Sequence, residues 1–402
     1  MKEKGLVDYF ENFLQSSSIF KSKQVLQSNY SPDSIVHRDD EINKVAKILA
    51  PSLRKERVSN LFIYGKTGTG KTLVVSYTTK QLLKIASEKE IGLKVIYTNC
   101  KLKRVADTEY RLLAELSRAF GKSIPPTGLP TDEVYNIFFE TVDKEKQIVL
   151  LILDEIDQLM EKSGNEVLYN LTRINSELKQ SQISIIGISN DLSFTEKLDP
   201  RVRSSLSEEE LVFPPYNAFQ IQDILKERAK DAFCDNVLET GLVEKCAAYA
   251  AREHGDARRA MELLRVAGEI AERECKNQVG IMHLDKAESK IENDRIIHII
   301  RTYPKQSQLI LYSILCLNIK KRDIVFTGEI YELYEYLCEK LSLRPLTQRR
   351  VSDVLSELDM LGLINAKIIS KGRYGRMREI SLSVEESVLP FVKKILEENL
   401  GL

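Results

Sequence analysis

The sequence of 402 residues lacks a long hydrophobic run, a Cys-x-x-Cys pair and any net charge. Its longest apolar stretches, such as 148–153, have the length of a strand and are far shorter than the roughly 20 residues that cross a bilayer. The first twenty residues contain Lys, Glu and Asp and lack the apolar centre of a signal peptide. These absences predict a cytoplasmic protein with no membrane partner.

The cysteines and the charge balance exclude two further classes of protein. The scattered cysteines fit neither a zinc site nor a disulfide framework, so we expect reduced thiols. Basic and acidic side chains number 59 each, so any surface that binds nucleic acid must be local. The six cysteines are Cys100, Cys234, Cys246, Cys275, Cys316 and Cys338.

The stretch 60–73, NLFIYGKTGTGKTL, is an apolar run that breaks into a glycine-rich turn. Its G-x-x-x-x-G-K-T spacing is that of the phosphate-binding loop of P-loop NTPases. Backbone N–H groups must surround a phosphate there, and side chains at the glycines would block that path. Lys71 can reach the β- and γ-phosphates, and the hydroxyl of Thr72 can bind Mg²⁺. The predicted nucleotide-binding residues of the loop are Gly65, Thr67, Gly68, Thr69, Gly70, Lys71, Thr72 and Leu73.

A second chemical motif is the stretch 148–158, IVLLILDEIDQ. A continuous apolar run suits a parallel strand buried on both faces, and ligands gather at the carboxyl ends of such strands. We expect Asp154 to hold Mg²⁺ and Glu155 to polarise the attacking water. The next predicted strand, 184–190, ends in Asn190, whose amide can orient the same water.

The segment 29–41 precedes the first predicted strand, and in many P-loop ATPases such a segment packs on the adenine. Its candidate contacts are Tyr30, Ile35, His37 and Arg38, and an ordinary surface lead-in to a capped helix is the alternative.

Two arginine positions are further candidates for the nucleotide site. Arg201 or Arg203 either faces the nucleotide of a neighbouring subunit or makes a surface salt bridge. Arg258 lies in the first turn of a predicted helix, where a cation is unfavourable. A local rule broken in this way often marks a functional site, so we expect Arg258 to contact the γ-phosphate.

The C-terminal part predicts three helices (307–319, 327–341, 348–361) and two strands (363–370, 377–383), the pattern of a winged helix. Lys and Arg outnumber Asp and Glu over 345–382, which favours DNA phosphates as partners. A winged helix used for protein contacts is the alternative. The acidic residues of the third helix, Asp353, Glu357 and Asp359, are expected to face away from DNA. The candidate DNA contacts are Thr347, Gln348, Arg349 and Arg350 on that helix, and Lys371, Arg373, Tyr374 and Arg376 in the hairpin.

The ordered set GKTGTGKT, LILDEID, ISN, GDARRA and a winged helix resembles one family over 29–383. This is the family of archaeal replication initiators that are related to the eukaryotic origin-recognition complex and its Cdc-type helicase loader. The resemblance implies an α/β fold: an AAA+ P-loop domain with a parallel sheet (1–213), a helical lid (214–295) and a winged-helix DNA-binding domain (296–402). It also implies a DNA-contacting insertion within 101–132, with Lys122, Thr127 and Gly128 as candidates.

The resemblance implies an ATP-dependent initiator that recognises origin duplex DNA, associates with the nucleoid and helps to load the replicative helicase. Paralogous initiators are further implied partners, and ATP/ADP with Mg²⁺ is the implied cofactor, hydrolysed slowly as a switch. Two other functions stay open: a clamp-loader-like ATPase that turns over actively in a ring, and a signalling ATPase or transcriptional regulator. The resemblance also implies a role for each site residue. Lys71 and Thr72 are ligands in the phosphate loop, and Asp154 and Glu155 form the second acidic motif. Asn190 and Arg258 are the two sensors, and Arg201 acts on the nucleotide of a neighbouring subunit.

Overall fold

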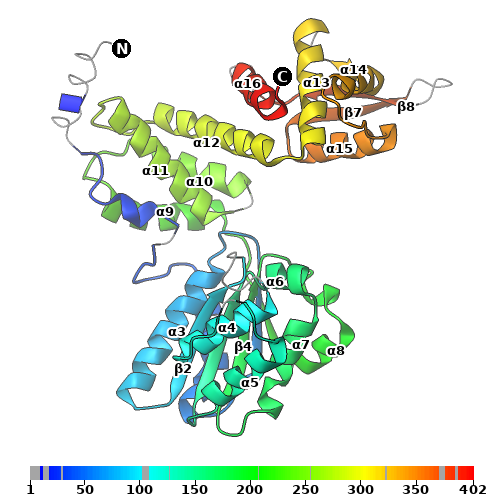
Figure 1. The fold of residues 1–402 in the computed structure, drawn as a ribbon. Coiled ribbons are helices and arrows are strands. Elements are labelled where there is room, and N and C mark those ends of the chain that lie inside the picture. The colour runs from blue at the N-terminus through cyan, green and yellow to red at the C-terminus, as the bar shows by residue number, and fades with distance from the viewer. Residues whose placement is uncertain are drawn as a thin grey trace. The chain divides into compact units, whose positions relative to one another are not determined.

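The structure, a computed structural model, forms two compact units, Met1–Leu284 and Asp285–Leu402 (Figure 1). Within the described ranges, no helix is long and apolar enough to cross a membrane. The described residues are 10–11, 18–28, 30–101, 108–125, 127–206, 208–253, 255–321, 324–370, 376–384 and 388–402.

The first unit is built on a five-stranded sheet in the order β2-β3-β4-β1-β5, in which all neighbouring strands are parallel. Successive residues of a strand face opposite sides of the sheet. In β1, Phe62 and Tyr64 therefore enter the core on one face, and Leu61 and Ile63 enter the core on the other. The strands are β1 (Asn60–Tyr64), β2 (Leu93–Asn99), β3 (Ile148–Asp154), β4 (Gln182–Ser189) and β5 (Glu208–Val212).

Helices cover both faces of the sheet, which confirms the predicted α/β fold (Figure 1). One face is covered by α2 (Asp39–Leu49) and α3 (Lys71–Glu88), with the 3₁₀ turn η2 (Ala50–Arg54) between them. The other face carries α4 (Glu109–Ala119), α5 (Thr131–Val142), α6 (Ile156–Ser163), α7 (Glu166–Arg173) and α8 (Pro200–Leu206), with the short turns η3 (Ile174–Ser176) and η4 (Thr195–Lys197).

A helical lid follows β5, and the N-terminal segment packs on it. The ring of Phe20 stacks on Phe233 with the centroids 4.7 Å apart. A Cβ atom at Gly268 would lie 2.4 Å from the Phe20 ring, so glycine is needed for this approach. The segment therefore links the lid to α2. The lid elements are α9 (Ala218–Ala232), α10 (Leu242–Arg252) and α11 (Ala257–Arg273), with η1 (Lys23–Leu26) against α9 and α11.

The second unit has the predicted three helices and β-hairpin of a winged helix. Its sheet is antiparallel in the order β6-β8-β7, and Tyr334 is fully buried in its core. The sequence pattern did not predict the last helix, α16, which packs Val392, Ile395 and Leu396 into this core. The elements are α12 (Ile281–Thr302, which leads in from the first unit), α13 (Lys305–Lys321), β6 (Val325–Phe326), α14 (Thr327–Lys340), α15 (Gln348–Met360), β7 (Ile364–Ser370), β8 (Arg376–Leu382) and α16 (Leu389–Leu400).

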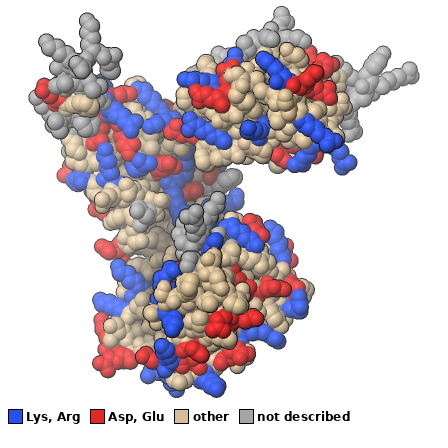
Figure 2. Space-filling model, viewed as in Figure 1, with Lys and Arg blue, Asp and Glu red and all other residues tan. Residues whose placement is uncertain are grey.

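Positive and negative side chains are interspersed over the described parts of both units on the face drawn in Figure 2. This agrees with the net charge of zero and with the expectation that a nucleic-acid surface is local.

Candidate nucleotide-binding site

The loop between β1 and α3 has a shape that only glycine allows at two positions. Gly68 and Gly70 have φ values of +71° and +88°, which disfavour any side chain. A Cβ atom at Gly68 would lie 1.7 Å from Oδ1 of Asp256 in the lid, and one at Gly70 would lie 2.8 Å from the hydroxyl of Tyr216. The loop is therefore a cradle of bare backbone at the N-terminus of α3, where anions bind favourably.

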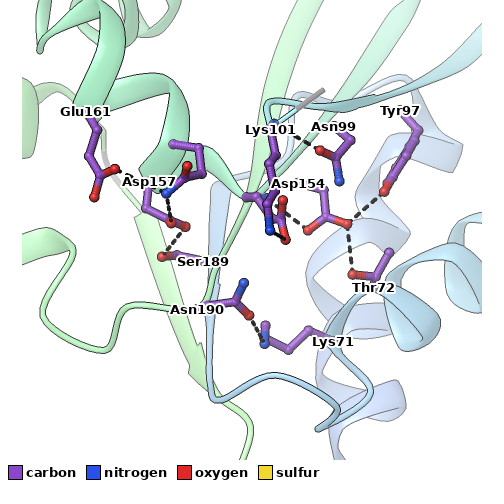
Figure 3. Close-up of polar contacts among 12 residues, drawn as sticks. Lys71, Thr72, Tyr97, Asn99, Lys101, Asp154, Asp157, Glu161, Ser189 and Asn190 are labelled. Atoms are coloured by element: carbon purple, nitrogen blue, oxygen red, sulfur yellow. Dashed lines mark hydrogen bonds and ion pairs between the residues drawn. The ribbon is translucent and has the colours of Figure 1, made fainter. Parts of the chain in front are cut away.

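Lys71 is buried at the centre of this loop. Its Nζ donates to the carbonyls of Gly65 and Lys66 at 2.7 and 2.8 Å. It also donates to Oδ1 of Asn190 at 2.9 Å (Figure 3). Burial, and secondarily the positive charge of Arg258, lower the pKa of Lys71 to about 8, although Asp154 opposes the shift. An anionic ligand would remove this penalty, because it favours the charged ammonium.

Asp154 accepts hydrogen bonds from three directions at the end of β3. Its Oδ2 accepts from the hydroxyls of Thr72 at 2.9 Å and Tyr97 at 2.7 Å, and its Oδ1 accepts from the backbone N–H of Glu155 at 2.9 Å (Figure 3). Burial and the bond to Asp154 raise the pKa of Tyr97, so its hydroxyl stays a donor. The carboxylate is therefore held in one orientation beside Thr72.

Glu155 follows in the left-handed backbone region, with φ +53°, and directly precedes α6 as its N-cap residue. One of its carboxylate oxygens lies 3.7 Å from Nζ of Lys101. In the first turn of α6, Asp157 accepts a 2.8 Å hydrogen bond from Ser189 at the end of β4 (Figure 3). The ends of β3 and β4 are thus fixed to each other beside Asn190.

These groups line a cavity of about 620 Å³ that the sheet edge and the lid share. Its volume lies in the range of small-molecule sites, which is roughly 300–1,000 Å³. Of the residues predicted from the sequence, the structure places the following in the lining: Tyr30, Ile35, Thr67, Gly68, Gly70, Lys71, Thr72, Leu73, Asp154, Glu155, Asn190 and Arg258.

The lining also contains residues that the sequence motifs missed. Tyr97 and Asn99 lie at the end of β2, and Asn99 is paired in register with Asp154 of β3. That adjacency was the available signal, since parallel strands bring their carboxyl ends to one edge. Nothing in the motif pattern indicated several further lining residues, among them Tyr216, Ile224, Arg228, Asp231 and Met261.

Two residues of the lead-in segment hold neighbouring elements and are absent from the lining that the described residues form. Nε2 of His37 lies 2.9 Å from Oδ2 of Asp223 on α9. Arg38 is 2% exposed and binds the carbonyl of Thr69. Gly65 and Thr69 are also absent from the lining that the described residues form. The carbonyl of Gly65 accepts a hydrogen bond from Lys71, and the hydroxyl of Thr69 donates to the carbonyl of Lys66, so both residues hold the shape of the loop.

The lid contributes Arg258 to the cavity from the first turn of α11. Asp256 caps this helix, because its Oδ1 accepts from the backbone N–H groups of Arg258 at 2.8 Å and Arg259 at 3.3 Å. The capping carboxylate offsets the unfavourable placement of two cations at a helix N-terminus. Arg259 pairs with Glu253 at 3.1 Å, while the side chain of Arg258 is exposed at the cavity.

Arg201 lies on α8, outside the lining of its own chain's cavity. Its side chain is 80% exposed, and its guanidinium makes hydrogen bonds of 3.1 and 3.0 Å with the two oxygens of Asp199. Arg203 is exposed on the same helix.

Three family models match successive parts of the chain. They are an AAA domain over 54–194, a Cdc6 AAA+ ATPase-type lid domain over 222–289 and a CDC6 C-terminal winged helix domain over 298–391. The chain is 54% identical to ORC1-type DNA replication protein 1 of Methanosarcina mazei, over 96% of this chain and 92% of the relative. It is 52% identical to the ORC1-type DNA replication protein of Thermococcus onnurineus, over 96% and 93%.

The chain belongs to the family of ORC1-type DNA replication proteins. Membership implies a nucleotide-binding AAA domain, at the place where the cavity lies. Among solved structures, the chain resembles the Aeropyrum pernix ORC1 protein in complex with DNA, with 45% identity, a TM-score of 0.80 and coverage of 95% of this chain and 98% of that one.

The winged helix of this ORC1-type chain exposes the first turn of α15. The hydroxyl of Thr347 caps the helix by accepting from the N–H of Arg350 at 3.4 Å, and Gln348, Arg349 and Arg350 are exposed. The guanidinium of Arg350 lies 3.6 Å from Asp353. Lys371, Arg373 and Tyr374 lie outside the described residues, and Arg376 begins β8.

The other two acidic side chains of α15 have partners inside the second unit. Glu357 accepts from the hydroxyl of Tyr303 at 3.4 Å, and Asp359 accepts from the backbone N–H of Ala366 at 3.0 Å. They are therefore fixed at the far end of the helix from Arg349. In the first unit, the candidate insertion residues Lys122, Thr127 and Gly128 are exposed between α4 and α5.

Proposed function

We propose that the protein is an ATP-controlled replication initiator, in which a nucleotide joins the lid to the sheet edge. The observation that carries the proposal is that Lys71 and Asp154 from one side and Arg258 from the other line a single cavity. A triphosphate in this cavity would contact both sides. Because a ligand shifts a conformational equilibrium only by its differential contacts, the γ-phosphate at Arg258 would separate the ATP state from the ADP state.

The donor set fits ATP or ADP with Mg²⁺. Mg²⁺ takes few protein ligands beside phosphates and waters, and prefers hard oxygens such as the hydroxyl of Thr72 and the carboxylate of Asp154, which lie 2.9 Å apart. When bound, the ion would offset the charge of the phosphates. The loop N–H groups and Lys71 would hold the phosphates, and Glu155 and Asn190 would position the attacking water for slow turnover.

We propose that the second unit binds origin duplex DNA. The exposed, capped start of α15 supports this role, and so does the DNA complex of the A. pernix relative. Four further parts of this proposal rest on family membership. The insertion and the hairpin contact DNA, and the protein recruits the replicative helicase and paralogous initiators. It also associates with the nucleoid, and its domains divide at residues 213 and 295. The proposed DNA contacts are Lys122, Thr127, Gly128, Thr347, Gln348, Arg349, Arg350, Lys371, Arg373, Tyr374 and Arg376.

Duplex binding across a salt series tests this proposal. Origin-like and scrambled duplexes are compared with ATP and then ADP bound, using the full chain and the variant Lys71→Ala. We expect a preference for the origin-like duplex that survives at high salt and changes with the nucleotide, and we expect Lys71→Ala to lose the nucleotide effect. Binding that ignores sequence and vanishes with salt would contradict the origin assignment, because only phosphate contacts behave in that way.

A further inference from the structure

Arg228, on the lid helix α9, is a buried cation that lines the nucleotide cavity. It is 9% exposed, and its guanidinium carbon lies 4.7 Å from the ring centroid of Tyr30, which also lines the cavity. Within the described part of the chain, no hydrogen bond or ion pair reaches the guanidinium. The guanidinium therefore has N–H donors that a ligand in the cavity can use.

A guanidinium in a mostly buried side chain is unfavourable when it has no acceptor, because it loses part of its water and gains no compensating hydrogen bond. Burial lowers the pKa of Arg228, and the neighbouring charges of Asp231 and Glu227 only partly offset this effect. The missing acceptors are therefore expected from whatever fills the cavity. A nucleotide offers acceptors at both ends, namely the phosphate oxygens and the ring nitrogens of the base.

The surroundings of Arg228 are those of the base end. The charges that act on Lys71 include Asp154 and Arg258, whereas those that act on Arg228 are Tyr30, Asp231 and Glu227. The lid already supplies Arg258 to the phosphate end. One turn before Arg228 on α9, Ile224 lines the cavity, as Ile35 does from the lead-in segment, and apolar side chains suit the flat face of a base.

We propose that Arg228 is a base-binding residue that donates a hydrogen bond to a ring nitrogen of the purine while it stacks on Tyr30. This inference rests on the proposed nucleotide function of the cavity. An arginine N–H is charged and rigidly directed, and adenine offers it a single acceptor on an edge, such as N7 beside the N6 amino donor. Since Tyr30 belongs to the lead-in segment and Arg228 to the lid, the base ties these two elements together.

The test compares ligands that keep or lack the base. Dissociation constants for ATP, ADP and ribose 5-triphosphate are measured by calorimetry on the full chain and on Arg228→Met, which keeps the apolar stem and removes the donors. We expect Arg228→Met to bind ATP and ADP about tenfold more weakly, the loss of one hydrogen bond to a charged group, and to bind ribose 5-triphosphate as the wild type does. The matched control is Lys226→Ala, because Lys226 lies on the same helix, pairs with Glu244 at 3.5 Å and is outside the cavity lining.

Two outcomes would overturn the assignment: unchanged affinity of Arg228→Met for ATP, or an equal loss of affinity for ribose 5-triphosphate, which would place the effect at the phosphates or in the fold. Melting without nucleotide checks folding. If Arg228→Met does not fold, Tyr30→Phe and Tyr30→Leu replace it. Tyr30→Leu removes the stacking ring and is expected to weaken ATP binding, whereas Tyr30→Phe keeps the ring. Equal affinities of these two variants for ATP would overturn the proposal. Failure of the wild type to bind ATP, or full ATP binding by Lys71→Ala, would instead refute the nucleotide site itself.

Discussion

Arg38 and Thr69 are joined by a 3.1 Å hydrogen bond, from the guanidinium Nε to the carbonyl oxygen in the phosphate loop. The same guanidinium donates to the carbonyl of Pro214 at 2.6 Å and lies 3.9 Å from the ring centroid of Tyr216. Pro214 and Tyr216 belong to the connection from β5 to the lid. Arg38 therefore ties the phosphate loop to the segment that connects β5 to the lid.

Replacing Arg38 by alanine is expected to destabilise the first unit. The substitution leaves the buried carbonyl of Thr69, and the carbonyl of Pro214, without this donor, which costs about 2 kcal/mol and lowers Tm by about 5 °C. Thermal melting without nucleotide measures the change. The control is Arg57→Ala, because Arg57 is exposed just before β1, and it should change Tm little. Equal Tm values for the two variants would contradict the role of Arg38.

Gly68→Ala is expected to weaken ATP binding by about tenfold or more, because the added Cβ would meet Oδ1 of Asp256 at 1.7 Å and push the lid helix cap off the loop. Gly164→Ala is the matched control: Gly164 has a similar φ of +75°, and open space surrounds its Cβ position. Both variants bear the backbone strain of about 1 kcal/mol, but only the first meets the lid. Calorimetry with ATP separates them, and equal affinities would show that the lid contact is unimportant.

The parts of the site that the sequence revealed are those whose chemistry lies in consecutive residues. The loop from Gly65 to Thr72 must be bare backbone followed by a cation and a hydroxyl, and the run that ends in Asp154 is apolar on both faces of a strand. Such local demands can be seen without knowledge of the fold. The winged helix was equally visible, because its helices and hairpin follow one another directly.

The parts that the sequence did not reveal depend on long-range neighbours. Tyr97 reaches Asp154 only because β2 lies beside β3, and the strand order is not written in either strand. Arg228 joins the cavity through the packing of the lid. Arg38 was predicted to lie against adenine from its place in the lead-in segment, but its guanidinium donates to backbone carbonyls on two other segments and to Glu41, and it lies over the ring of Tyr216.

ATP affinity is expected to fall as the pH rises through about 8. The pKa of Lys71 is about 8 in the free protein, and neighbouring phosphates would raise it in the complex. Between these two pKa values the neutral amine must take up a proton on binding, so affinity falls by up to about tenfold per pH unit. Below about pH 7, Lys71 is charged in both states and contributes no such dependence.

Calorimetry from about pH 7 to about 9.5, in buffers with different ionisation enthalpies, measures both the affinity and the proton uptake. Lys71→Arg is the control, because its guanidinium stays charged over this range and should remove the decline. Wild-type affinity that does not change with pH would mean that Lys71 keeps its charge in the free protein or does not touch the phosphates.

Asp353→Asn is expected to tighten duplex binding by about two- to fivefold at low salt. Asp353 lies 3.6 Å from the guanidinium of Arg350 at the exposed start of α15, where it neutralises a cation and repels phosphates. The gain should shrink as salt screens it. Glu398→Gln is the control, because it breaks a similar exposed ion pair on α16, in which a carboxylate oxygen of Glu398 lies 3.9 Å from Nζ of Lys394. Equal behaviour of the two variants in a fluorescence anisotropy titration would remove α15 from the DNA surface.

Arg201→Ala is expected to lower ATP turnover without changing ATP affinity. Arg201 is 80% exposed and lies outside its own cavity lining, and we propose that its guanidinium acts on the nucleotide of a neighbouring copy. Turnover per chain should therefore rise with protein concentration for the wild type and stay flat for the variant. Arg203→Ala, on the same helix, decides between the two arginines, since only the residue that acts in trans should abolish the rise. Wild-type turnover that is independent of concentration, with and without DNA, would exclude both arginines and leave the Arg201–Asp199 pair a surface salt bridge, which contributes little.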